Sequence, residues 1–230
     1  MMNRWRSETV RGEVEDLIGM LDRSGIKVRP DAGESLMRLA DLTYRWNKRV
    51  NLVSRKDIAR LVSYHFCDAA SLLPIIRPEI PIRLLDVGGS NGIPGLVLSA
   101  LSPSIEVTVC DSRQKRKGFM DEACEALGKQ ATHVIARVDS ESYVTANLGR
   151  FDLIVARAVT RLRLLIRWCL PLLRPGGYLA AYKGSRCREE VRQAEAYLWT
   201  HGGNLVMVLG SPFADKCNPL RQFAMVGKSS

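Results

Sequence analysis

The chain has 230 residues, of which 34 are Lys or Arg and 24 are Asp or Glu, and its formal net charge is +10. Its length and its 46% hydrophobic content are those of a folded protein with one sizeable core, which excludes a disordered, collagen-like or disulfide-stapled chain. The excess of positive charge favours a polyanionic partner, with nucleic acid ahead of an anionic membrane surface.

The six cysteines are scattered, without a C-x-x-C pair or a spacing that gathers four zinc ligands. We therefore expect reduced thiols and no metal site. No apolar run reaches the roughly 20 residues that a membrane span needs, because arginines interrupt the most hydrophobic region between residues 157 and 167. The N-terminus lacks the apolar stretch of a signal peptide, so the sequence predicts a cytoplasmic protein.

The first third of the chain has the pattern of helices. Residues 7–50 carry apolar side chains at helical spacing, interrupted by Gly25 and Pro30. Residues 51–73 continue this pattern, and Ser54 can cap a helix that begins near Lys56 and Asp57. We expect residues 1–80 to form a basic helical extension packed on a core domain of residues 81–230.

From Arg83 onward, short apolar runs alternate with amphipathic stretches. The predicted strands are 83–88, 105–111, 133–138, 151–157 and 178–184, and helices are predicted at 116–127 and 161–173. This alternation indicates an α/β fold with a doubly wound, Rossmann-like, mostly parallel sheet. The apolar runs 204–213 and 219–228 are joined by a turn alone, which predicts an antiparallel C-terminal hairpin.

The most distinctive local motif is LLDVGGSNGIPG at residues 84–95, where a buried strand leads into a glycine-rich turn and then a helix. In an open α/β sheet, ligands bind beyond the carboxyl ends of the strands, where this turn lies. A dinucleotide turn would need glycines where this chain has Ser90 and Ile93. The looser pattern suits S-adenosylmethionine, which carries no phosphate. Asp111, at the end of the next strand, either accepts hydrogen bonds from ribose hydroxyls or caps the following helix.

Six short motifs occur in order along the chain: W-N-K-x-x-N-L at 46–52, H-x-x-D at 65–68, D-V-G-x-x-x-G-x-P-G at 86–95, D-S-x-x-K-R at 111–116, A-R-A at 156–158 and Y-K-G at 182–184. Together they resemble the RsmG family, also called glucose-inhibited division protein B. The resemblance extends from about Leu39 to the C-terminus. It implies a class I methyltransferase that uses S-adenosylmethionine to methylate guanine N7 in 16S, small-subunit, ribosomal RNA.

The resemblance also implies site residues. By position it gives cofactor contacts at Gly88, Ile93, Val138, Asp139 and Arg157, to which the glycine turn and the second strand add Gly92 and Asp111. The residues expected to face RNA are Arg55, His65, Asp68, Arg116, Arg157, Arg161 and Lys183. His65 is equally compatible with a core histidine, and Asp68 one helical turn later can pair with it. The chain departs from the family at Ser90, preceded by the extra Gly89, and at Ala69, where the family commonly has Ser.

Methylation at guanine N7 makes modest chemical demands. The ring nitrogen is unprotonated at neutral pH, so the transfer requires alignment rather than a general base, and no catalytic proton-transfer residue is expected. The expected partner is small-subunit ribosomal RNA or the assembled small subunit, bound by a monomer. Because N7 lies in the deep, narrow major groove of an RNA helix, we expect an unpaired target guanine.

Several alternatives stay open on the sequence alone. Lys183 at the end of the fifth strand can serve as the base of a ribose 2′-O methyltransferase. The same fold serves S-adenosylmethionine methyltransferases that act on small molecules or proteins. A non-catalytic RNA-binding module on this fold is the third alternative, for which Ser90 would be the visible sign.

Overall fold

The computed structural model describes residues 4–89 and 91–229; Ser90 lies outside the described residues. Their sheet has seven strands in the order β3-β2-β1-β4-β5-β7-β6. The strands are β1 (Ile82–Val87), β2 (Ile105–Asp111), β3 (Ala131–Ile135), β4 (Phe151–Arg157), β5 (Leu173–Lys183), β6 (Gly203–Gly210) and β7 (Gln222–Lys228). Strands β1 to β5 pair in parallel, whereas β7 is antiparallel to both β5 and β6. The predicted mostly parallel sheet with an antiparallel C-terminal hairpin is confirmed.

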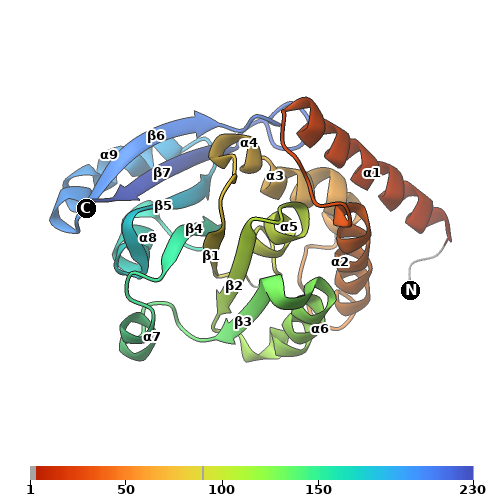
Figure 1. Cartoon of the computed structure of the whole chain (residues 1–230), viewed down its shortest axis with the longest axis horizontal. Coiled ribbons are helices and arrows are strands. Elements are labelled where there is room, and N and C mark those ends of the chain that lie inside the picture. The colour runs from red at the N-terminus through yellow and green to blue at the C-terminus, as the bar shows by residue number, and fades with distance from the viewer. Residues whose placement is uncertain (1–3, 90, 230) are drawn as a thin grey trace.

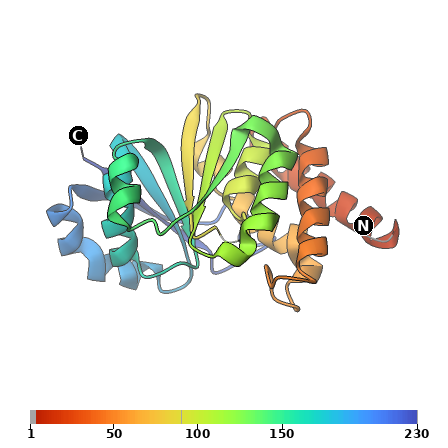
Figure 2. The same cartoon turned by 90° about the horizontal axis from the view of Figure 1, so that it is seen from below.

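Helices cover both faces of the sheet, as Figure 2 shows. On one face lie α2 (Ala32–Trp46), α5 (Gly95–Leu101) and α6 (Lys117–Leu127), and on the other α7 (Glu141–Ala146), α8 (Leu162–Cys169) and α9 (Cys187–Thr200). Successive strand residues alternate between two hydrophobic cores, so that Leu84 packs in the first core and Leu85 in the second. Burial on both faces explains why the strands read as continuous apolar runs.

The N-terminal helices share the first of these cores. Helix α1 (Arg4–Arg23) buries Val14, Leu17 and Leu21 in the same cluster as strand residues of β1 and β2. The chain continues through a 3₁₀ turn (Ile58–Arg60), a π-helix (Leu61–Phe66), α3 (Cys67–Ala70) and α4 (Leu73–Ile76). Figure 1 shows α1 and α2 on the same side of the sheet as α3 and α5.

Three of the differences from the predicted elements have a clear structural cause. Ser54 Oγ accepts the Asp57 N–H at 3.1 Å as a cap, but a 3₁₀ turn and a π-helix follow instead of an α-helix. β3 ends at Ile135 because its partner β2 ends at Asp111, which pairs with Ile135. β5 begins at Leu173 rather than at Tyr178, since Pro175, Gly176 and Gly177 belong to the strand, where the register with β4 shifts.

The segment that follows α2 is fixed by the first of the family motifs. The side-chain oxygen of Asn47 accepts the N–H groups of Leu52 and Val53 at 2.8 and 2.9 Å. The Trp46 ring lies against Gly118, where an added Cβ would come within 2.7 Å of the indole. Arg116 is buried and donates to the Asn51 carbonyl at 3.1 Å. These contacts set the path of the chain into the π-helix.

Candidate active site

A cavity of about 560 Å³ opens beyond the carboxyl ends of β1, β2, β3 and β4. Six of the seven predicted cofactor residues line it: Gly88, Ile93, Asp111, Val138, Asp139 and Arg157. The seventh, Gly92, is buried in the turn beside the cavity. The parallel strands bring these positions together because their carboxyl ends meet at one edge of the sheet.

The turn after β1 needs glycine at specific positions. Gly88 has a φ of 68°, and an added Cβ would lie 2.8 Å from a methyl carbon of Val159. Gly92 has a φ of 70°, and its Cβ would overlap the Leu96 side chain. A side chain at either position would be strained by the left-handed backbone and by this crowding. The turn therefore keeps its backbone open to the cavity.

The Asp86 side chain fixes one end of the glycine turn. It is fully buried, and its Oδ2 accepts the Gly95 N–H at 2.8 Å. Burial raises the pKa of Asp86 to about 7, because desolvation disfavours the charged carboxylate. The carboxyl thus ties the start of α5 to the end of β1.

Asp111 forms a local turn and keeps one oxygen free. Its Oδ1 accepts the Arg113 N–H at 2.7 Å, two residues along the chain. Its Oδ2 has no hydrogen-bond partner in the part of the chain that the structure describes. Asp111 therefore stabilises the following turn and still presents an acceptor in a cavity that it lines.

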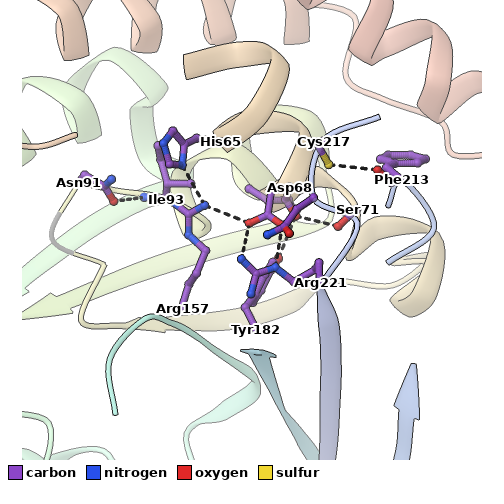
Figure 3. Close-up of polar contacts among 12 residues, drawn as sticks. His65, Asp68, Ser71, Asn91, Ile93, Arg157, Tyr182, Phe213, Cys217 and Arg221 are labelled. Carbon is purple, nitrogen blue, oxygen red and sulfur yellow. Dashed lines mark hydrogen bonds and ion pairs between the residues drawn. The ribbon is translucent and has the colours of Figure 1, made fainter. Parts of the chain in front are cut away.

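Figure 3 shows two arginines that converge on the buried Asp68. Arg221 donates from Nε to Oδ1 at 2.7 Å and from Nη2 to Oδ2 at 2.9 Å, while Arg157 donates from Nη1 to Oδ2 at 3.1 Å. Arg221 also donates to the Lys183 carbonyl at 2.9 Å. Both arginines line the cavity, so Asp68 acts on the site through the side chains that it holds.

The predicted pairing of His65 with Asp68 is replaced by a contact with Arg157. Nδ1 of His65 lies 3.4 Å from Arg157 Nη1, which lies between the two residues of the H-x-x-D motif. Burial, reinforced by the Arg157 charge, lowers the pKa of His65 to about 4. The imidazole is therefore neutral at physiological pH, and Nδ1 is positioned to accept from the guanidinium.

The remaining predicted RNA contacts lie in different settings. Arg55 is exposed on the segment before the π-helix, whereas Arg116 is buried and bonded to the Asn51 carbonyl. Arg161 and Lys183 line a second hollow of about 490 Å³, which shares Arg157 and Arg221 with the first cavity. Lys183 is only 8% exposed, and its ammonium donates to the Thr160 carbonyl and to Glu190 at 2.8 and 2.7 Å. With its ammonium engaged in this way, Lys183 is not poised to act as a base.

Sequence reasoning missed several cavity residues. Arg221 is 153 residues from Asp68 and belongs to none of the recognised motifs, so no local pattern linked the two residues. Trp168 of α8 also lines the cavity. Arg60 lies over the Tyr64 ring at 4.2 Å, and their spacing of four residues was a detectable signal.

The described residues hold neither a cluster of metal-ligating side chains nor a membrane-spanning helix. No group of three or more His, Cys, Asp or Glu side chains is placed to hold a metal ion there. Among the same residues, no helix has the length and apolar character required to cross a bilayer.

The fold and cavity define the class of protein. The ribosomal protein L11 methylase of Lactobacillus delbrueckii subsp. bulgaricus superimposes with a TM-score of 0.52 and 18% identity, over 72% of this chain and 79% of that one. Fibrillarin in its complex with Nop5p gives a TM-score of 0.51 at 12% identity, over 70% of this chain and 80% of that one. The chain has the fold of the Rossmann-like methyltransferases.

Sequence comparison narrows this class to one family. The family model described as rRNA small subunit methyltransferase G (GidB) matches residues 32–214. Ribosomal RNA small subunit methyltransferase G of Symbiobacterium thermophilum is 37% identical over 201 residues, which cover 85% of this chain and 80% of the relative. Its counterpart in Chromohalobacter salexigens is 38% identical over 170 residues, 74% and 78% of the two chains. The chain belongs to the rRNA small subunit methyltransferase G family, which confirms the resemblance found in the sequence motifs.

The cofactor of such enzymes is S-adenosylmethionine, and the cavity fits it. Gly88 and Val159, which a Cβ at position 88 would crowd, both line the cavity, and the free Asp111 oxygen is an acceptor of the kind that ribose hydroxyls require. Ile93, Val138 and Trp168 supply apolar surface for a purine.

Proposed function

We propose that this protein transfers the methyl group of S-adenosylmethionine to N7 of a guanine in 16S ribosomal RNA. The observation that supports this most directly is the position of Arg157. Arg157 lines both the cofactor cavity and the neighbouring cationic hollow, so a nucleic-acid acceptor and the cofactor would meet at one residue. Family membership supports the same reaction and does not favour a small-molecule substrate, a protein substrate or a non-catalytic module.

The protein's contribution is alignment. S-adenosylmethionine supplies a sulfonium-bound methyl group, and the N7 lone pair forms the new bond to carbon as the carbon–sulfur bond breaks. No proton leaves N7, so the neutral His65 and the paired Lys183 need not act as acid or base. Holding both reactants in line supplies an effective molarity on the order of 10⁵–10⁸ M.

The proposed cofactor contacts are the cavity residues Gly88, Ile93, Asp111, Val138, Asp139 and Arg157, with Gly92 shaping the turn. The proposed RNA contacts are divided by accessibility: Arg55 and Arg161 are exposed and fit direct phosphate contact, whereas Asp68, Arg116 and Lys183 are buried and fit a supporting role. His65 and Arg157 lie between these groups at the cavity wall.

We further propose that a cytoplasmic monomer acts on small-subunit ribosomal RNA or on the assembled subunit. In this arrangement the helical residues 1–80 form an extension of the core domain of residues 81–230. The charge of +10 supports such a partner, because Lys and Arg neutralise phosphates.

The substrate form is tested by initial rates of methyl transfer to three acceptors: assembled small subunits, deproteinised 16S RNA and a fully base-paired duplex from the same RNA. We expect one of the two folded substrates to react and the duplex to be inert, because N7 is inaccessible in an A-form helix. Equal rates on the duplex and on the folded acceptors would contradict the proposal.

A further inference from the structure

The second hollow lies between the loop after β4 and the loop after β5. Its lining comes from residues 156–161 and 165 on one side and from residues 182–184, 186, 190 and 221 on the other. It shares Arg157, Ala158, Val159 and Arg221 with the cofactor cavity. A molecule in this hollow would therefore lie beside the cofactor without occupying the cofactor's space.

Two guanidinium groups of this hollow are available to an anion. Arg161 and Arg186 are exposed, and neither side chain has a hydrogen bond or ion pair with any described residue. The other cations of the hollow are engaged: Lys183 with Glu190, and Arg157 and Arg221 with Asp68. Arg161 and Arg186 come from different loops, so they present two cationic groups at one opening.

Glu190 is the acid in this cationic lining. Its Oε2 accepts the Leu162 N–H at 2.8 Å and the Lys183 ammonium at 2.7 Å, which fixes the carboxylate. Its Oε1 has no partner among the residues that the structure describes. The side chain is 25% exposed and lines the second hollow but not the cofactor cavity.

We propose that the second hollow receives the acceptor guanosine, with Glu190 reading the Watson–Crick edge of the base and Arg161 and Arg186 holding its phosphates. This inference rests on the proposed function and adds to it a subsite and the residue that selects guanine.

The chemistry of the base supports this assignment. Guanine presents two adjacent donors, N1–H and the N2 amino group, and these complement a carboxylate. Adenine presents the unprotonated N1 at the same place, and that lone pair repels Glu190. The N7 atom lies on the opposite edge of guanine from N1 and N2. A base that bonds to Glu190 therefore directs N7 away from this residue, as transfer from the adjoining cofactor cavity requires.

The wild-type protein provides a test that needs no substitution. The cofactor cavity is first saturated with S-adenosylhomocysteine, so that added nucleotides report on the second hollow, and dissociation constants are measured by ligand-observed NMR. We expect GMP to bind about tenfold or more tightly than AMP. We also expect 1-methyl-GMP, which lacks N1–H, to lose this advantage. Equal affinities for GMP and 1-methyl-GMP would overturn the assignment of Glu190.

Substitutions then assign the two parts of the subsite. Glu190→Gln keeps an acceptor for the Leu162 N–H, and we expect it to reduce the GMP-to-AMP preference about tenfold. Arg186→Ala should weaken GMP and AMP equally and leave their ratio unchanged, because the phosphate is common to both. Glu189→Gln is the matched control, since the adjacent Glu189 pairs with Arg192 outside the hollow. A GMP preference that survives in a folded Glu190→Gln variant would overturn the proposal.

Methyl transfer to small subunits is measured in parallel. If the enzyme methylates RNA but the second hollow binds GMP no better than AMP, the subsite is refuted and the proposed function stands. A guanine preference without transfer to RNA would refute the proposed function and leave the subsite intact.

Discussion

Asp68 is the residue on which the buried charges of the site depend. Its carboxylate is inaccessible to solvent and accepts hydrogen bonds from Arg157 and Arg221, whose side chains are 11% and 12% exposed. Removing one partner of such a cluster leaves cations in a poorly solvated place. Asp68 is therefore both a stability determinant and a positioning residue for the cavity wall.

The variant Asp68→Asn should lower the free energy of unfolding by about 3–5 kcal/mol and reduce methyl transfer, because two arginines lose their charged partner. Urea unfolding and initial rates measure the two effects. Glu34→Gln is the control: it breaks the exposed Glu34–Arg38 pair and should change stability by less than about 0.5 kcal/mol. A loss for Asp68→Asn no larger than that of the control would refute this role.

Asp86 gives stability a pH dependence of known sign. Burial raises its pKa from the usual 3.8 to about 7, so between these values the folded protein binds a proton that the unfolded chain has released. This group therefore makes the protein less stable as pH rises through that window. Asp86→Asn keeps an acceptor for the Gly95 N–H and removes the titration.

We expect the stability of Asp86→Asn relative to wild type to increase from about pH 4 to above about pH 7, by up to about 4 kcal/mol. His65 has a lowered pKa and contributes the opposite slope between about 4 and 6.5, but it is present in both proteins and cancels in the difference. Urea unfolding at both ends of the range is the measurement. A difference that is the same at every pH would show that Asp86 does not titrate as described.

At the scale of elements, the glycine turn after β1 makes the sharpest prediction. Gly88→Ala places a Cβ 2.8 Å from Val159 at a φ of 68°. We expect at least about tenfold weaker binding of S-adenosylmethionine in equilibrium dialysis, because the backbone and Val159 must both move. Gly12→Ala on α1 meets nothing within 4 Å and should leave this affinity unchanged. Unaltered cofactor affinity in Gly88→Ala would mean that the turn does not border the cofactor.

The sequence predicted the central strands β1 and β4 well because they are buried on both faces, which leaves apolar runs such as 151–157. Six of the seven predicted cofactor residues line one cavity, because they lie at or shortly after the carboxyl ends of parallel strands. Errors arose where tertiary contacts outweigh local pattern. The π-helix at Leu61–Phe66 has no local signal that separates it from an α-helix, and it carries Tyr64 and His65 to the cavity.

The cluster around Asp68 could not be predicted from local sequence patterns. Its members come from α3, β4 and the segment just before β7, with separations of 89 and 153 residues. The sequence indicated that His65 and Asp68 are one turn apart. In the structure both side chains contact the guanidinium of Arg157. Glu190 was also missed, because local pattern does not reveal its ion pair with Lys183 or the hollow that both residues line.

At the scale of the whole molecule, the net charge of +10 predicts how RNA binding depends on salt. The logarithm of the affinity for 16S RNA should fall linearly with the logarithm of salt concentration, because bound phosphates release counterions. Fluorescence anisotropy across a salt series measures the slope. The affinity for S-adenosylmethionine is the internal control and should change little, since this ligand carries no phosphate. An RNA affinity that does not depend on salt would contradict an electrostatic interface.

The most direct test of the central claim is methyl transfer from labelled S-adenosylmethionine to small ribosomal subunits that lack this modification, followed by nucleoside analysis of the RNA. The account predicts that the label is recovered as 7-methylguanosine. Recovery in any other nucleoside, or no label in RNA from an enzyme that binds the cofactor, would contradict it.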